Sequence, residues 1–256
     1  MNTKASRKLE GQKTLLGRTM HSIAYNDQRD EFTVPQPFAQ ALLTFRGGAN
    51  GEEAPIRVIQ GPKTQLVEPD RLALDIINDE FFVPLDTVKR ITVYRASANG
   101  DVAPLRAIEG PDTTIGAEAL AVDNVHNLLI AAGVGAEGLR FRIFDRKAEG
   151  NAKPLRIIGG KNSMFSRLGG PIAVHAPKGW ILATVRGPGA LASDEAFLGI
   201  WSVNDEGDVP PRWTVGGPHG VFRMPRGIAL DVKNKTIIAS DKRLNAVLSF
   251  HFPEMF

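Results

Sequence analysis

The 256-residue sequence contains no cysteine, which excludes disulfide bonds and thiolate metal sites. Its formal net charge is only +3 and its basic residues are scattered, so the composition gives no indication of a nucleic-acid partner. No apolar run is long enough to cross a bilayer, and residues 1–19 lack the apolar core of a signal peptide. We therefore expect a soluble protein without a transmembrane segment, cytoplasmic unless a leader has been removed.

The chain is rich in glycine (26 residues), in proline (17) and in repetition. One phrase occurs four times, as GEEAPIRVIQGPKTQL (51–66), GDVAPLRAIEGPDTTI (100–115), GNAKPLRIIGGKNSMF (150–165) and GDVPPRWTVGGPHGVF (207–222). A second phrase occurs five times, and its alanines lie 49, 48, 52 and 56 residues apart, at Ala24, Ala73, Ala121, Ala173 and Ala229. A full unit contains four short β-rich runs separated by Gly, Asn, Asp and Pro turns, and no segment keeps a helical period.

A recurring unit of four antiparallel strands is typical of a propeller blade, which buries its faces against neighbouring blades. The last unit, 226–256, contains only three such runs, but residues 1–16 match the repeated phrase. The alignment places Arg7 on Arg57, Arg106, Arg156 and Arg212, and Gly11 on Gly61, Gly110, Gly160 and Gly217. We therefore predict one all-β domain, 1–256, a five-bladed β-propeller of four-stranded antiparallel blades. In this prediction strand 5–16 completes the last blade and covers two free strand edges.

The phrases APLRAIEGPDTTI and PRGIALDV resemble the repeats of NHL-type β-propellers, a superfamily that includes gluconolactonase-like enzymes. NHL propellers usually have six blades, so the chain is either a true five-bladed ring or a fragment of a longer protein. The gluconolactonase-like enzymes hold a divalent metal, usually calcium, with Glu, Asn and Asp side chains. The corresponding positions here are Arg18, Thr19 and His21, which include no carboxylate. The resemblance therefore implies a propeller that lacks the catalytic and metal-binding set of those enzymes.

Residues that recur in every blade are interpreted as architecture. An arginine in each last strand is expected to pair with a carboxylate or a carbonyl of the same or the next blade. Asp75, Asp123 and Asp231 stand at strand ends, where a carboxylate accepts hydrogen bonds from the backbone of the following turn. GVGAEG (133–138) has the letters of a dinucleotide-binding loop, but an alternating strand follows it where a helix is required, so we reject that interpretation.

The fourth blade departs most from the repeat. It contains all three tryptophans, His175 in place of the recurring Asp or Asn, and an insertion at 186–197. The insertion is either a longer surface loop or part of a ligand-binding or partner-binding face at the mouth of the central channel. His175 is expected on the opposite face. The residues expected on the binding face are Arg186, Asp194, Glu195, Phe197, His219, Arg223, Asp241 and Arg243.

The sequence thus predicts a non-catalytic NHL-like propeller that binds a protein or a small-molecule ligand, with no cofactor, no metal and no nucleic-acid partner. The alternative is a metal-dependent lactonase or hydrolase of the gluconolactonase-like type with a rearranged site. Bound calcium or zinc would discriminate between the two.

Overall fold

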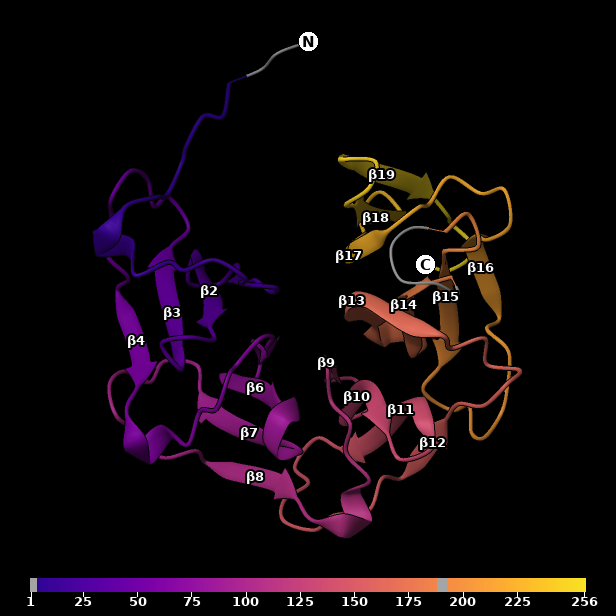
Figure 1. Ribbon diagram of the computed structural model, residues 1–256, viewed down its shortest axis with the longest axis horizontal. Coiled ribbons are helices and arrows are strands. Elements are labelled where there is room, and N and C mark those ends of the chain that lie inside the picture. The colour runs from indigo at the N-terminus through magenta and orange to yellow at the C-terminus, as the bar shows by residue number, and fades with distance from the viewer. Residues whose placement is uncertain (1–3, 188–192) are drawn as a thin grey trace. The chain divides into compact units, whose positions relative to one another are not determined.

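The computed structural model describes residues 4–187 and 193–256. Its strands form five antiparallel sheets, which are the blades of a five-bladed β-propeller (Figure 1). Each strand pairs with the next one along the chain, as expected for blades that are built in sequence order. In the described part of the chain, no helix has the length and apolar character needed to cross a membrane.

The first compact unit, Met1–Ala107, contains the first blade and most of the second. The strands of the first blade are β1 (Ala24–Asn26), β2 (Glu31–Gln36), β3 (Ala41–Arg46) and β4 (Arg57–Gln60). Those of the second are β5 (Ala73–Asp75), β6 (Glu80–Leu85), β7 (Arg90–Arg95) and β8 (Arg106–Glu109). Three short 3-10 helices accompany them: η1 (Gln12–Thr14), η2 (Pro62–Thr64) and η3 (Asp86–Val88).

The second compact unit, Ile108–Phe256, contains the other three blades. The third blade comprises β9 (Ala119–Asp123), β10 (Leu128–Gly135), β11 (Gly138–Asp145) and β12 (Arg156–Ile158). The fourth comprises β13 (Arg167–His175), β14 (Trp180–Arg186), β15 (Phe197–Ser202) and β16 (Trp213–Gly216). The fifth has three strands within the described residues, β17 (Pro225–Asp231), β18 (Thr236–Asp241) and β19 (Ala246–His251), and the unit also contains η4 (Pro111–Thr113) and η5 (Ala176–Lys178).

Apolar side chains bury the blade faces against one another within each unit. In the first unit, Leu42 and Ile59 of the first blade pack with Phe81 and Tyr94 of the second. Equivalent clusters join the third blade to the fourth and the fourth to the fifth. A single blade cannot bury both of its faces, so this shared burial is the reason that the repeats occur together.

The repeated phrase links each blade to the next. Leu9, Ile59, Ile108 and Ile158 each form a parallel bridge to the glycine that opens the next copy, at Gly51, Gly100, Gly150 and Gly207. The residue after that glycine then accepts a hydrogen bond from the backbone of the preceding turn. Asp101, for example, accepts from the Lys63 N–H at 2.7 Å, and Asp208 accepts from the Ser163 N–H at 3.0 Å. The phrase is repeated because the start of each copy caps the end of the one before.

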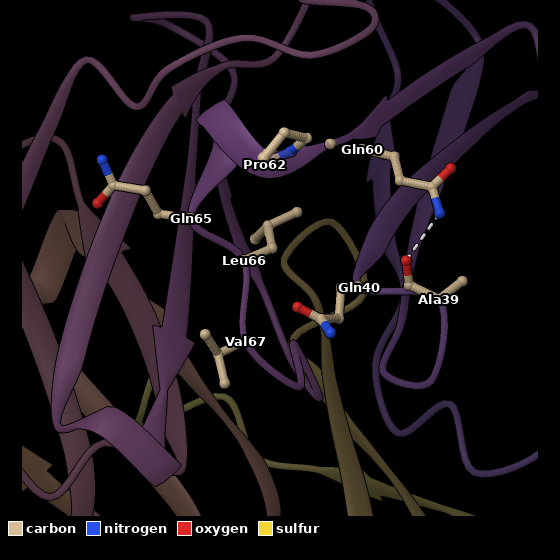
Figure 2. A pocket seen from close by; sticks show the side chains of 8 residues that line it. Ala39, Gln40, Gln60, Pro62, Gln65, Leu66 and Val67 are labelled. Carbon is tan, nitrogen blue, oxygen red and sulfur yellow. Dashed lines mark hydrogen bonds between the residues drawn. The ribbon is translucent and has the colours of Figure 1, made fainter.

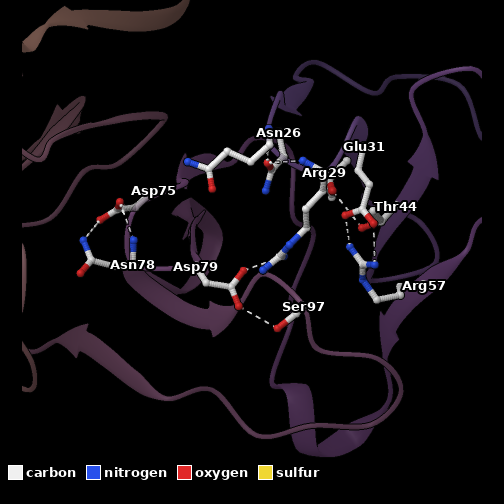
Figure 3. A network of polar contacts seen from close by, with 11 residues as sticks. Asn26, Arg29, Glu31, Thr44, Arg57, Asp75, Asn78, Asp79 and Ser97 are labelled. Carbon is white, nitrogen blue, oxygen red and sulfur yellow. Dashed lines mark hydrogen bonds and ion pairs between the residues drawn. The ribbon is translucent and has the colours of Figure 1, made fainter.

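The arginine series is structural, with one correction. Arg57 forms a two-pronged ion pair with Glu31, in which Nη1 lies 2.9 Å from Oε1 (Figure 3), and Arg106 pairs with Glu80 in the same way. Arg156 donates to the carbonyl of Val203 in the next blade at 2.7 Å. Arg212, however, is not a member of the series.

The strand register shows why. The Arg212 N–H donates to the carbonyl of Ile200, as the N–H of Leu155 does to Ile143. Trp213, opposite Ile200 in the ladder, therefore holds the position of Arg156. The alignment of Arg212 with the series is wrong by one residue, because Arg212 stands five residues before Gly217 whereas Arg156 stands four residues before Gly160.

The aspartate turns are confirmed. Asp75 accepts a hydrogen bond from the Asn78 N–H at 3.1 Å, and Asp123 accepts from the His126 N–H at 2.9 Å. GVGAEG connects β10 directly to β11, so a strand follows it as predicted.

The predicted pairing of residues 5–16 with β19 joins segments of different units and remains a prediction. Within the first unit, Leu9 bridges Gly51, and the Glu10 N–H donates to the Gly51 carbonyl at 2.9 Å.

Candidate functional site

The candidate site lies where β14, β15, β17 and β18 end or begin in the fourth and fifth blades. Residues 188–192 of the insertion lie outside the described residues, but both ends of the loop are defined. Gly187 approaches the Ser193 side chain so closely that a Cβ on Gly187 would lie 2.3 Å from the Ser193 hydroxyl oxygen. The Ser193 N–H donates to the Arg223 carbonyl at 3.0 Å. This bond attaches the insertion to the loop that precedes β17.

Asp241 holds that second loop in place. Its side chain is buried, and one oxygen accepts hydrogen bonds from the N–H groups of Arg223 and Met224, both at 2.8 Å. The other oxygen accepts from Arg243 and Leu244, at 2.9 and 3.0 Å. Burial alone would raise the pKa of Asp241, but these four backbone donors hold the pKa below its ordinary value. The carboxylate is therefore a structural anchor that joins the loop before β17 to the β18–β19 turn.

Exposed side chains sit on this anchored frame. The His219 ring is 93% exposed and lies 3.7 Å from a carboxylate oxygen of Asp194, measured from Nδ1. The backbone of His219 has a φ of 63°, a left-handed conformation that a residue with a side chain adopts at a cost. Glu195 and Arg243 are also exposed. These four predicted site residues are therefore exposed to solvent.

The other predicted site residues make contacts within the fold. Arg223 donates to the carbonyls of Gly220 and Phe222, at 2.5 and 2.7 Å, and so holds its own loop. Phe197 is only 5% exposed and belongs to the core between the third and fourth blades. Arg186 donates a hydrogen bond from Nη2 to the Gly169 carbonyl at 3.3 Å.

Arg167 and Arg226 lie beside Arg186 but were not singled out from the sequence. A signal for Arg226 was present, because it stands three residues before Ala229. In three other copies that position holds His21, Asp70 or Glu118.

The tryptophans and His175 have packing roles. Trp180 meets Trp213 edge to face at 5.1 Å between ring centroids, and Trp201 is fully buried. His175 lies at the end of β13 remote from Arg167, buried against the Phe256 ring. Burial, and then the charge of Lys178, lower the pKa of His175. Its Nδ1 atom has no hydrogen-bond partner among the described residues.

A separate pocket of about 430 Å³ lies in the first unit (Figure 2). Leu66 and Pro62 face its centre, and Gln40 lies at its lower side. Gln60 is held at the rim by a hydrogen bond from its Nε2 to the Ala39 carbonyl at 2.8 Å. In residues 4–187 and 193–256, no group of three or more His, Asp or Glu side chains is placed to hold a metal ion.

No protein-family model and no curated protein sequence matches the chain. Among solved structures, hydrazine synthase from Kuenenia stuttgartiensis superposes with a TM-score of 0.60 and 8% identity over 93% of this chain. This chain spans 57% of that one. A chain of a nidogen/laminin complex gives a TM-score of 0.58 and 11% identity, covering 91% of this chain and 80% of that chain. These two structures therefore resemble this protein in fold alone, and the fold is the β-propeller.

Proposed function

We propose that the protein is a non-catalytic, NHL-like β-propeller that binds a protein or a small-molecule ligand. The proposed contact surface comprises the described parts of three loops: 193–197, 217–224 and 241–244. The observation that carries the proposal is the anchoring of these loops by buried Asp241 and by the bond from Ser193 to Arg223. β-Propellers present such loops for binding in general.

In this proposal, the anchoring reduces the conformational entropy that is lost on binding. Ordering a loop costs conformational entropy, and a loop that is ordered before binding does not incur that cost again when a partner arrives. Holding His219 in a left-handed backbone conformation beside Asp194 fits a surface arranged in advance for contact.

The test compares the intact protein with a variant in which residues 187–196 are replaced by a two-residue turn. We expect the variant to fold, because β14 and β15 can still form a hairpin, and to lose ligands that raise the Tm of the intact protein. His219→Ala should weaken the same ligands. His126→Ala is the matched control, since His126 also contacts an aspartate, at 2.8 Å from Asp123, but at another turn of the unit.

Identical ligand and partner profiles for the intact and trimmed proteins would refute the proposed surface. Specific binding of calcium or zinc together with lactone hydrolysis would instead favour the metal-dependent hydrolase.

A further inference from the structure

The pocket of the first unit lies between two turns of the first blade. Residues 37–40 form the turn from β2 to β3, and residues 60–67 run from the end of β4 through η2. Both turns contribute side chains to the lining of the pocket, which has a volume of about 430 Å³. Ligand-binding pockets in proteins have volumes of about 300–1,000 Å³, so this one has room for a small ligand group. None of its lining residues belongs to the proposed contact surface.

The polar part of the lining consists of amide side chains. Three glutamines line the pocket: Gln40, Gln60 and Gln65. All six glutamines of the sequence lie between positions 12 and 65, so the later blades contain none. The equivalent positions of the second blade hold Lys89, Glu109 and Thr114. The repeated architecture therefore does not require the amides, which are particular to the pocket of the first blade.

Hydrogen bonds fix two of these amides in opposite senses. Nε2 of Gln60 donates to the Ala39 carbonyl at 2.8 Å (Figure 2), which leaves its Oε1 as an acceptor for a ligand. Oε1 of Gln65 accepts from Nη1 of Arg90 at 3.1 Å, which leaves its Nε2 as a donor. The pocket thus presents one fixed acceptor and one fixed donor, and the exposed side chain of Gln40 adds a group that can do either.

Apolar side chains occupy the space between the fixed amides. Figure 2 shows Pro62 and Leu66 between Gln65 and Gln60, and Val67 lies below them. None of the lining residues is charged, so a charged ligand group would lose its hydration without gaining an opposite charge from the lining. A polyol would place hydroxyl groups against these apolar side chains, which is also unfavourable. An amide group next to an aliphatic side chain matches both parts of the lining, because it carries one N–H and one C=O.

We propose that this pocket binds an uncharged peptide group with an aliphatic side chain, as presented by a short apolar segment of a polypeptide. The peptide N–H donates to Oε1 of Gln60, the peptide C=O accepts from Nε2 of Gln65, and the side chain packs on Leu66 and Pro62. This inference goes beyond the proposed function, because it assigns a second site in the first unit that needs none of the loops of the proposed contact surface.

The first experiment compares three probes that share one skeleton: N-acetyl-leucinamide, which is neutral, N-acetyl-leucine, an anion, and leucinamide, a cation at about pH 6.5. The readout is the side-chain NH₂ signals of the glutamines in ¹⁵N NMR of the full chain, which single substitutions can assign. We expect the neutral probe to shift the signals of Gln40, Gln60 and Gln65 with a Kd of about 1–10 mM, as its small size dictates. Both charged probes should bind at least about tenfold more weakly.

Two variants test the assigned roles. Gln65→Leu removes the donor, and the backbone accepts leucine here, because Leu15 holds the equivalent position with a φ of 57° against 58° for Gln65. It should weaken the neutral probe by about five- to tenfold. Gln28→Leu, at an exposed glutamine of the β1–β2 turn, is the matched control and should leave the Kd unchanged.

Gln60→Glu places a negative charge at the acceptor position, and glutamate is native at the equivalent Glu10 and Glu109. This variant should reverse the preference, so that leucinamide binds more tightly than N-acetyl-leucinamide.

Four results would overturn the proposal. The first two are no binding of N-acetyl-leucinamide at about 20 mM, above the expected Kd, and equal affinity for the three probes. The third is an unchanged Kd in Gln65→Leu. The fourth is tighter binding of another class of ligand: of N-acetyl-leucine, which would assign the pocket to a carboxylate that reaches Arg90, or of glucose, which would assign it to a sugar.

Discussion

In three blades, the first residue of the second strand interacts with the residue that opens the fourth strand. Where it is glutamate, at Glu31 or Glu80, the fourth strand carries an arginine that pairs with it. In the fourth blade the same two positions hold Trp180 and Trp213, which pack edge to face. An ion pair in one blade and an aromatic pair in another thus occupy the same place in the repeat.

The Arg57–Glu31 pair provides a prediction at this scale. Both side chains are largely buried, and the Arg57 guanidinium holds the pKa of Glu31 below its ordinary value. Arg57→Ala should therefore lower the free energy of unfolding by about 1–3 kcal/mol, because it leaves a buried carboxylate without its partner. Urea denaturation of both single mutants and the double mutant measures the coupling.

The exposed pair of Arg46 and Glu53 in the same blade is the control for that cycle. Its N–O distance is also short, at 2.6 Å, but solvent screens it, so Arg46→Ala should cost less than Arg57→Ala. Equal losses in the two cycles would show that burial adds nothing to the Arg57 pair.

At the scale of single elements, the end of β13 differs from the ends of the other first strands. Asp75 or Asp123 caps the following turn, whereas His175 is followed by η5 and makes no side-chain cap. The ring of His175 instead packs on Phe256 at 5.0 Å between centroids. The end of this strand is therefore stabilised by apolar packing, which requires the imidazole to stay neutral.

This packing makes stability depend on pH in a defined direction. Burial and the charge of Lys178 lower the pKa of folded His175 below that of an ordinary histidine, so the unfolded chain takes up the proton more readily. The stability that neutral His175 contributes is present above the unfolded pKa and is lost as the pH falls below it. His175→Phe should flatten the loss between about pH 6.5 and 5, by at most about 1.4 kcal/mol per pH unit.

Urea midpoints across that pH range measure the effect, with His251→Phe, at an exposed histidine, as the control. A wild-type profile that His175→Phe leaves unchanged would contradict the buried neutral imidazole.

The strands and turns were predictable because their residues recur, and each recurrence tests the others. Arg212 was assigned to the arginine series one residue out of register, although a count without gaps from Gly207 already places Trp213 on Arg156, as the ladder shows. The burial of Phe197 could not be predicted from the sequence either, because Phe197 lies at the boundary between the insertion and β15. The convergence of Arg186 and Arg226 depends on the contact of Gly169 with β17, which joins residues far apart in sequence.

At the scale of the whole molecule, the last blade differs from the others, because its sheet has three strands within the described residues. β19 is the edge of its sheet, and Val247 on that strand is 70% exposed, whereas Leu42 at the equivalent position of β3 is 1% exposed. If residues 5–16 complete this blade as predicted, the repeat register specifies the pairing. Since Arg57 lies opposite Thr44, Arg7 should lie opposite Ser249.

An engineered disulfide tests that register. The chain has no cysteine, so Arg7→Cys with Ser249→Cys gives a single possible intramolecular bond. Directly opposed residues on antiparallel strands have Cα atoms about 4.5–5.5 Å apart, within the range a disulfide spans. We expect the variant to form the bond on mild oxidation and to gain Tm, as read by gel mobility and thermal unfolding.

Lys8→Cys with Ser249→Cys is the control, because a shift of one residue turns the side chain to the other face of the sheet. If both variants cross-link equally, or neither does, residues 5–16 do not close the last blade in this register.

Because each repeated turn is capped by the next copy, the turns of the blades are completed in chain order during synthesis. Asp101, which accepts the hydrogen bond from the turn at Lys63, is synthesised 38 residues after it. Asp208 is synthesised 45 residues after the turn at Ser163. On a ribosome that adds about 5–20 residues per second, the donor and the acceptor are synthesised roughly 2–9 s apart. Each nascent blade therefore emerges with its last turn unfinished, and synthesis of the following blade completes it.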